Sequence, residues 1–209
     1  TMDLTKILVP DFIKKKQSGE KIVMLTAFDA TIARLLDQAG VDALLVGDSL
    51  GMVALGHETT LPVTMEEMIH HTLAVSRGTQ HALVIADMPF LSYQIGVDEA
   101  VKNAGLMLKN GGASAVKIEG GCSAIEVVTR LVEVGIPVMG HLGVLPQSVH
   151  KTGGYAKRGI IPEEADQIMK DAIALEQAGA FSIVLEAIPA GLAVAVTKEI
   201  TIPTIGIGA

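Results

Sequence analysis

Short runs of apolar residues, many of them β-branched, recur along the whole chain. Each run is too short for a typical helix and is rich in Val, Ile and Leu, a pattern typical of strands buried on both faces of a sheet. The predicted strands comprise residues 22–28, 43–48, 82–88, 115–119, 137–141, 182–186 and 203–207.

The stretches between these runs are amphipathic, and their ends carry helix start and stop signals. We expect capping boxes at Thr64 with Glu67 and at Ser123 with Glu126, first-turn prolines at Pro162 and Pro189, and helix-ending glycines at Gly40, Gly111, Gly135 and Gly179. The predicted elements therefore alternate between strand and helix from one end of the chain to the other.

Alternating strands and helices predict parallel strands joined by crossover helices, and thus the α/β class. Seven such units exceed a typical doubly wound sheet and approach the eight of a closed (β/α)8 TIM barrel. The chain ends at Ala209, directly after the seventh run. We therefore expect residues 1–209 to form a single barrel domain that is incomplete at its C-terminus, with the last βα unit missing from this chain.

Composition and charge narrow the possible functions. Hydrophobic residues make up 49% of the chain and charged residues 19%, which excludes a disordered protein. A net charge of −7 argues against nucleic acid as a partner. No apolar run approaches the roughly 20 residues needed to span a bilayer. The lone Cys122 forms no internal disulfide, which favours a cytoplasmic location.

Acidic residues stand where predicted strands end: Asp48, Asp87, Glu119 and Glu186. In (β/α) barrels these strand ends share one mouth, which holds the catalytic groups. Several carboxylates in one mouth need a cation, and oxygen ligands favour Mg²⁺ first and Mn²⁺ next. The alternative is that each acid caps the helix that follows it.

Two further features belong to the same end of the predicted barrel. Lys117 lies two positions before Glu119, so both side chains point to one side of the strand. His141 ends the fifth predicted strand and is a candidate substrate contact. The basic, Gly-rich segment 141–159 that it opens is either a lid for an anionic cosubstrate or a solvated loop.

Six separated blocks of sequence, in order, resemble the ketopantoate hydroxymethyltransferase family. The blocks are MLTAFDA, VGDSLGMVALGHETTLPVTMEEMIHHT, ADMPFLSYQ, VKIEGG, VMGHLGVLPQSVHKTGGY and IPTIGIGA. The resemblance runs from about residue 6 to residue 209. It implies a barrel of the phosphoenolpyruvate/pyruvate type, a cytoplasmic location, a homodecamer and a step of pantothenate biosynthesis. In one departure, Phe28 stands where the family often has tyrosine.

The resemblance also implies a role for each candidate residue. Asp48, Asp87 and Glu119 match the family's metal-binding acids, the last of them bridged by water. Asp48, Ser49, Asp87 and Lys117 match the contacts to the 2-oxo acid, with His141 as a further candidate. Glu186 matches the proton acceptor.

The reaction that the resemblance implies is transfer of a hydroxymethyl group from 5,10-methylenetetrahydrofolate to 3-methyl-2-oxobutanoate, assisted by Mg²⁺. Two alternatives stay open from the sequence. One is another Mg²⁺-dependent carbon–carbon lyase or ligase of 2-oxo acids on the same barrel. The other is a truncated, non-catalytic assembly subunit.

Overall fold

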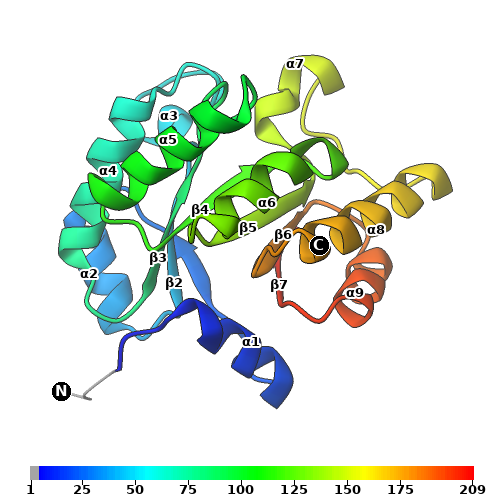
Figure 1. Cartoon of the computed structure of the whole chain (residues 1–209), viewed down its shortest axis with the longest axis horizontal. Coiled ribbons are helices and arrows are strands. Elements are labelled where there is room, and N and C mark those ends of the chain that lie inside the picture. Colours follow the sequence, from blue (N-terminus) through cyan, green and yellow to red (C-terminus); the bar gives the residue numbers. More distant parts are fainter. Residues whose placement is uncertain (1–4) are drawn as a thin grey trace.

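The computed structural model describes residues 5–209, in which parallel strands alternate with helices (Figure 1). The strands are β1 (Met24–Thr26), β2 (Ala43–Val46), β3 (Leu83–Asp87), β4 (Ala115–Glu119), β5 (Val138–Gly143), β6 (Ser182–Glu186) and β7 (Thr204–Ile207). The helices are α1 (Val9–Ser18), α2 (Ala30–Gln38), α3 (Leu50–Val53), α4 (Met65–Gly78), α5 (Val97–Lys109), α6 (Ile125–Glu133), α7 (Val149–Thr152), α8 (Pro162–Gln177) and α9 (Ala190–Glu199). Two short 3-10 helices, η1 (Cys122–Ala124) and η2 (Pro146–Ser148), precede α6 and α7.

The seven strands form one parallel sheet in the order of the sequence, from β1 to β7. The sheet curls into a nearly closed barrel, and helices cover its outside (Figure 1). All seven predicted strands and their parallel arrangement are thus confirmed. Among the described residues, no helix is both long and apolar enough to cross a membrane.

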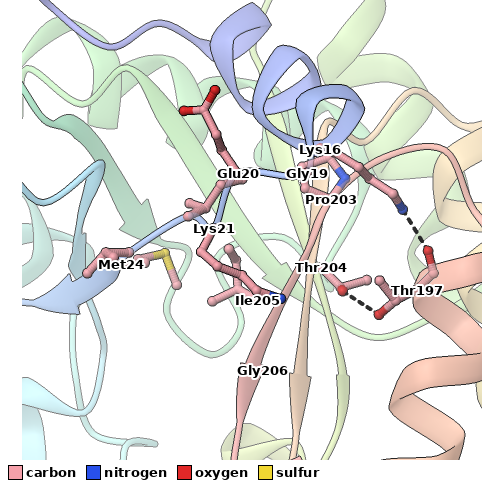
Figure 2. Close-up of a pocket in the computed structure, with 12 residues that line it drawn as sticks. Lys16, Gly19, Glu20, Lys21, Met24, Thr197, Pro203, Thr204, Ile205 and Gly206 are labelled. Carbon is pink, nitrogen blue, oxygen red and sulfur yellow. Dashed lines mark hydrogen bonds between the residues drawn. The ribbon is translucent and has the colours of Figure 1, made fainter.

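The barrel is open between its first and last strands. A cavity of about 580 Å³ lies there, bordered by residues 19–24 on one side and residues 203–206 on the other (Figure 2). Beside this cavity, the Nζ of Lys16 donates hydrogen bonds to the carbonyls of Thr197, Ile200 and Ile202 at 2.6–2.8 Å. The opening lies where an eighth strand would complete a (β/α)8 barrel.

Helix α1 packs across the end of the barrel at which the strands begin. Its Phe12 is fully buried and meets Phe181 edge to face, with ring centroids 5.4 Å apart. These rings join inward-facing residues of the strands, among them Leu83, Ile85 and Met139, in one apolar cluster. The N-terminal end of the barrel is therefore packed with side chains, and a functional site is left to the opposite end.

Several local predictions hold. Thr64 and Glu67 form a capping box at the start of α4, and Pro162 is the first residue of α8. Gly40, Gly135 and Gly179 end helices with φ between 83° and 94°, the left-handed region that glycine tolerates best.

Other local predictions were wrong. Ser123 does not cap α6, because η1 leads the chain into that helix and Ala124 takes the capping position. Pro189 precedes the first turn of α9. Gly111 does stand where α5 stops, as predicted, although the left-handed residue there is Gly112 (φ 73°) and a Cβ at Gly111 would lie 2.6 Å from the Met107 carbonyl.

The two outermost strands also depart from the prediction of burial on both faces. Strand β1 is shorter than predicted, and Leu25 on it is 44% exposed. Ile207 on β7 is 54% exposed. Each of these strands has a neighbouring strand on one side within the described sheet, which explains the exposure.

Candidate active site

A cavity of about 410 Å³ occupies the mouth of the barrel, where the parallel strands end. Every residue that the sequence singled out for chemistry lines it. These residues are Asp48, Ser49, Asp87, Lys117, Glu119, His141 and Glu186. The prediction that the strand-end acids converge in one mouth is therefore confirmed, while their individual roles remain predictions.

Asp48 and Asp87 are held next to each other at the ends of β2 and β3. The backbone N–H of Asp48 donates a hydrogen bond to Asp87 Oδ2 at 3.1 Å, and both residues are buried. Gly47 leaves room for the Ser49 hydroxyl, because a Cβ at position 47 would lie 2.8 Å from Ser49 Oγ. Ser49 follows on the same edge of the cavity, at the start of α3.

Lys117 brings a buried positive charge into this group of acids. Its Nζ lies 3.0 Å from Asp87 Oδ1 and 3.1 Å from His141 Nδ1. Burial alone would lower the pKa of Lys117, but the charges of Asp87, Glu119 and Asp48 raise it above its ordinary value. The amine therefore stays protonated and available to an oxyanion in the cavity.

His141 connects the lysine to the acid at the end of β6. An ammonium group only donates, so His141 Nδ1 accepts from Lys117 and the proton of a neutral ring sits on Nε2. Nε2 lies 3.1 Å from Glu186 Oε2 but has no hydrogen-bond partner among the described residues. Burial, together with the charge of Lys117, lowers the pKa of His141, which keeps the ring neutral.

Glycine at position 143 lets the ends of β5 and β6 come this close. Gly143 has φ 99°, and a Cβ on it would lie 2.1 Å from the Glu186 carbonyl oxygen. Any other residue would therefore push the Glu186 backbone away from β5. Local sequence thus fixes the position of Glu186, whose side chain is 26% exposed and faces the cavity.

Burial changes the acidity of two further carboxyl groups. Burial and the nearby charge of Asp87 raise the pKa of Asp48 to about 6. Burial raises the pKa of Glu119 to about 8, against the lowering effect of Lys117. Without a bound cation, both groups therefore favour the protonated state more than an exposed carboxyl does.

Metal-free protein should lose stability as pH rises toward 8. The folded-state pKa of Glu119, about 8, lies above its ordinary value of 4.5, so the folded state binds this proton more tightly than the unfolded state. The stabilisation of the folded state by this proton is complete below pH 4.5 and is lost as pH rises through about 8. Urea unfolding in a chelator should show the free energy of unfolding falling over this interval, on the order of a few kcal/mol.

The matched variant for this measurement is Glu119→Gln, which keeps the shape of the side chain and cannot titrate. Its unfolding free energy should depend less steeply on pH than that of the wild type. Equal slopes for the two proteins would show that Glu119 does not carry the effect.

The sequence did not reveal Gln147 of η2, which contacts both Asp48 and Glu119. Its backbone N–H donates to Glu119 Oε2 at 3.0 Å, and its side chain contacts Asp48 and Tyr93. Gln147 falls in the segment 141–159, for which the sequence predicts only a lid or a solvated loop, and a single glutamine in a loop carries no periodic signal. Of the basic residues there, Arg158 pairs with Glu164 at 3.0 Å.

The mouth fits a divalent cation held by a small number of protein oxygens. Asp87 Oδ1 is buried and forms an ion pair with Lys117 at 3.0 Å, but it has no hydrogen-bond partner among the described residues. Within residues 5–209, no three His, Cys, Asp or Glu side chains are placed closely enough to hold an ion by themselves. Mg²⁺ typically takes one or two carboxylates and fills its other positions with water or substrate, which the Asp48 and Asp87 pair allows.

Comparison with solved structures identifies the fold. Phosphonopyruvate hydrolase, in a structure described as a complex with oxalate and Mg²⁺, matches with a TM-score of 0.67 at 15% identity. The match covers 96% of this chain and 72% of that one. A 2,3-dimethylmalate lyase, described as a member of the PEP mutase/isocitrate lyase superfamily, also matches with a TM-score of 0.67, at 18% identity over 95% and 70% of the two chains. Both matches confirm the predicted (β/α) barrel fold.

Sequence comparison identifies the family. The model of the family described as ketopantoate hydroxymethyltransferase matches residues 6–209. The 3-methyl-2-oxobutanoate hydroxymethyltransferase of Pelobacter propionicus is 55% identical over 98% of this chain and 76% of its own length. The enzyme of the same name from Syntrophus aciditrophicus is 59% identical, over 93% of this chain and 71% of its own length. This chain belongs to the ketopantoate hydroxymethyltransferase family of transferases.

Proposed function

We propose that this chain transfers a hydroxymethyl group from 5,10-methylenetetrahydrofolate to 3-methyl-2-oxobutanoate, giving 2-dehydropantoate for pantothenate biosynthesis. The observation that carries the proposal is the single cavity in which two adjacent carboxylates, a buried lysine and a histidine–glutamate pair all meet. We infer the substrates from family membership, and the cavity contains groups suited to their chemistry.

In this proposal Asp48 and Asp87 hold a Mg²⁺ ion, or Mn²⁺ in its place, and Glu119 is the third acid beside it. When bound, the ion supplies Lewis-acid stabilisation of negative charge on the oxygens of the 2-oxo acid. Ser49 and Lys117 complete the contacts to these oxygens. Their positions beside the two aspartates in the cavity support this assignment.

The reacting carbon, C3 of the oxo acid, must first lose a proton. We assign its removal to Glu186, whose carboxylate faces the cavity from the end of β6, whereas Asp48 and Asp87 stand at the ends of β2 and β3. Negative charge then develops on the 2-oxo oxygen as the enolate forms. Lys117, which is protonated and fixed by Asp87 and His141, donates to that oxygen and stabilises the charge.

The carbon–carbon bond forms when C3 of the enolate attacks the one-carbon unit of the folate in its iminium form. Water then replaces the folate nitrogen on that carbon: the carbon–nitrogen bond breaks, the oxygen of the water becomes the new hydroxyl group, and tetrahydrofolate leaves with the proton on its nitrogen. His141 stays neutral through these steps and keeps Lys117 and Glu186 in a fixed relation, since it contacts both. The exposed side of Glu186 leaves the folate a route of approach.

The proposal extends to the state of the protein in the cell, where the support comes from the family resemblance. We expect self-association into a homodecamer and a cytoplasmic location. Sedimentation velocity of the purified chain measures the first directly, with a single decameric species as the expected result.

The test of the proposed function is incubation with 3-methyl-2-oxobutanoate and 5,10-methylenetetrahydrofolate, with and without Mg²⁺. We expect 2-dehydropantoate to form only with the metal. Cleavage of a 2-oxo acid substrate in place of one-carbon transfer would indicate a lyase on the same barrel. Absence of both product and metal-dependent deuterium exchange at C3 would indicate a non-catalytic subunit.

A further inference from the structure

The side-chain amide of Gln147 has a partner for both of its hydrogens and two partners for its oxygen at the mouth of the barrel. Its amide nitrogen Nε2 donates to Asp48 Oδ2 and to the Met88 carbonyl, each at 2.9 Å. Its amide oxygen accepts from Tyr93 Oη and from Gln94 Nε2, each at 3.0 Å. Gln147 is buried, and its bonds to Asp48, Met88 and Tyr93 are shielded from water.

This set of partners allows one orientation of the amide. Rotation by 180° would place the amide oxygen against the Met88 carbonyl, which cannot donate, and against Asp48, which only accepts when it is ionised. The single hydroxyl hydrogen of Tyr93 is shared between Gln147 Oε1 and the Glu119 carbonyl oxygen, which lies 3.1 Å from Tyr93 Oη. The Asp48 carboxylate is thereby fixed by a side chain that itself cannot rotate.

The backbone of Gln147 extends the same connection to a second acid. Its N–H donates to Glu119 Oε2, so one residue contacts carboxylates at the ends of β2 and β4. Gln147 belongs to the segment after β5, and its neighbour Pro146 lines the cavity. The position of this segment and the orientation of the two acids are therefore set together.

We propose that Gln147 is a positioning residue that orients Asp48 and Glu119 for the divalent cation and anchors the segment after β5 over the site. This inference rests on the proposed function, in which these acids lie at the metal. Gln147 acts through the carboxylates, as a partner in the outer shell of the ion. Loss of such outer-shell partners typically weakens metal affinity by about 10–100-fold.

The test is a titration of purified protein with Mn²⁺, followed by electron paramagnetic resonance of the free ion, for wild type and Gln147→Met. Methionine has a similar length and can fill the space without donating to Asp48. We expect Gln147→Met to bind Mn²⁺ about 10–100-fold more weakly. The matched control is Gln167→Met on α8, where an exposed glutamine bonds only Asp171, and its affinity should equal that of the wild type.

Unchanged Mn²⁺ affinity in folded Gln147→Met would overturn the role of Gln147. Should circular dichroism show that this variant does not fold, Tyr93→Phe is the substitute, since it removes one bond that fixes the amide. We expect a several-fold loss of affinity for Tyr93→Phe, and wild-type affinity would overturn the inference. A wild-type chain that binds no Mn²⁺ would overturn the proposed function itself, and the role of Gln147 with it.

Discussion

Glu186→Gln is expected to lower the rate of C3 proton exchange in 3-methyl-2-oxobutanoate by about 10²–10⁴-fold, the usual contribution of a positioned general base. Glutamine keeps the size of the side chain but cannot accept the proton. Because Glu186 contacts His141 and is not one of the proposed ligands, Asp48 and Asp87, binding of Mg²⁺ and of the oxo acid should change little. Proton NMR in D₂O measures the exchange, and calorimetry measures both affinities.

The matched control for this variant is Glu199→Gln, an exposed position at the end of α9. It should exchange the C3 proton at the wild-type rate. If Glu186→Gln exchanges as fast as this control, another group is the base. If it loses exchange and metal binding together, Glu186 supports the site as a whole and its role as proton acceptor is not established.

Asp87→Asn should weaken Mg²⁺ binding by at least about 100-fold, because loss of an outer-shell partner alone costs about 10–100-fold. The substitution removes one negative charge and leaves an amide oxygen that can still accept from the Asp48 N–H. The strand ends should therefore keep their positions, and the loss should reflect the ligand itself. Removing the partner of Lys117 should also reduce stability, which urea unfolding measures.

Asp166→Asn supplies the control for charge, since Asp166 lies exposed on α8 outside the cavity. Its Mg²⁺ affinity should match the wild type. Wild-type affinity in Asp87→Asn would remove Asp87 from the ligand set. The remaining acids, Asp48 and Glu119, would then have to hold the ion without it.

The strands and their ends could be predicted because the signals are local and repeated. Val, Ile and Leu runs predict buried parallel strands, and alternation with helices fixes their order. Once the strands are parallel, Asp48, Asp87 and Glu119 must end at the same edge, whatever the details of packing. The agreement between the predicted residues and the cavity lining follows from this geometry.

The residues that the sequence did not reveal depend on contacts between distant segments. Gln147 meets Asp48 across 99 positions, and no spacing in the sequence connects them. The sequence does not predict how the chain enters α6, because a residue of α8 stabilises η1: Asp171 accepts a hydrogen bond from the Cys122 N–H at 2.8 Å. Strand β1 is shorter and more exposed than its composition predicts because it lies at the open side of the barrel.

The most direct test of the account is a crystal structure of the protein grown with Mn²⁺ and 3-methyl-2-oxobutanoate, with the ion located by its anomalous scattering. We predict one ion in the barrel mouth, contacted by carboxylate oxygens of both Asp48 and Asp87, with the carboxylate and 2-oxo groups of the substrate beside it. An ion bound elsewhere, or an oxo acid bound in the mouth without any ion near these two aspartates, would contradict the account.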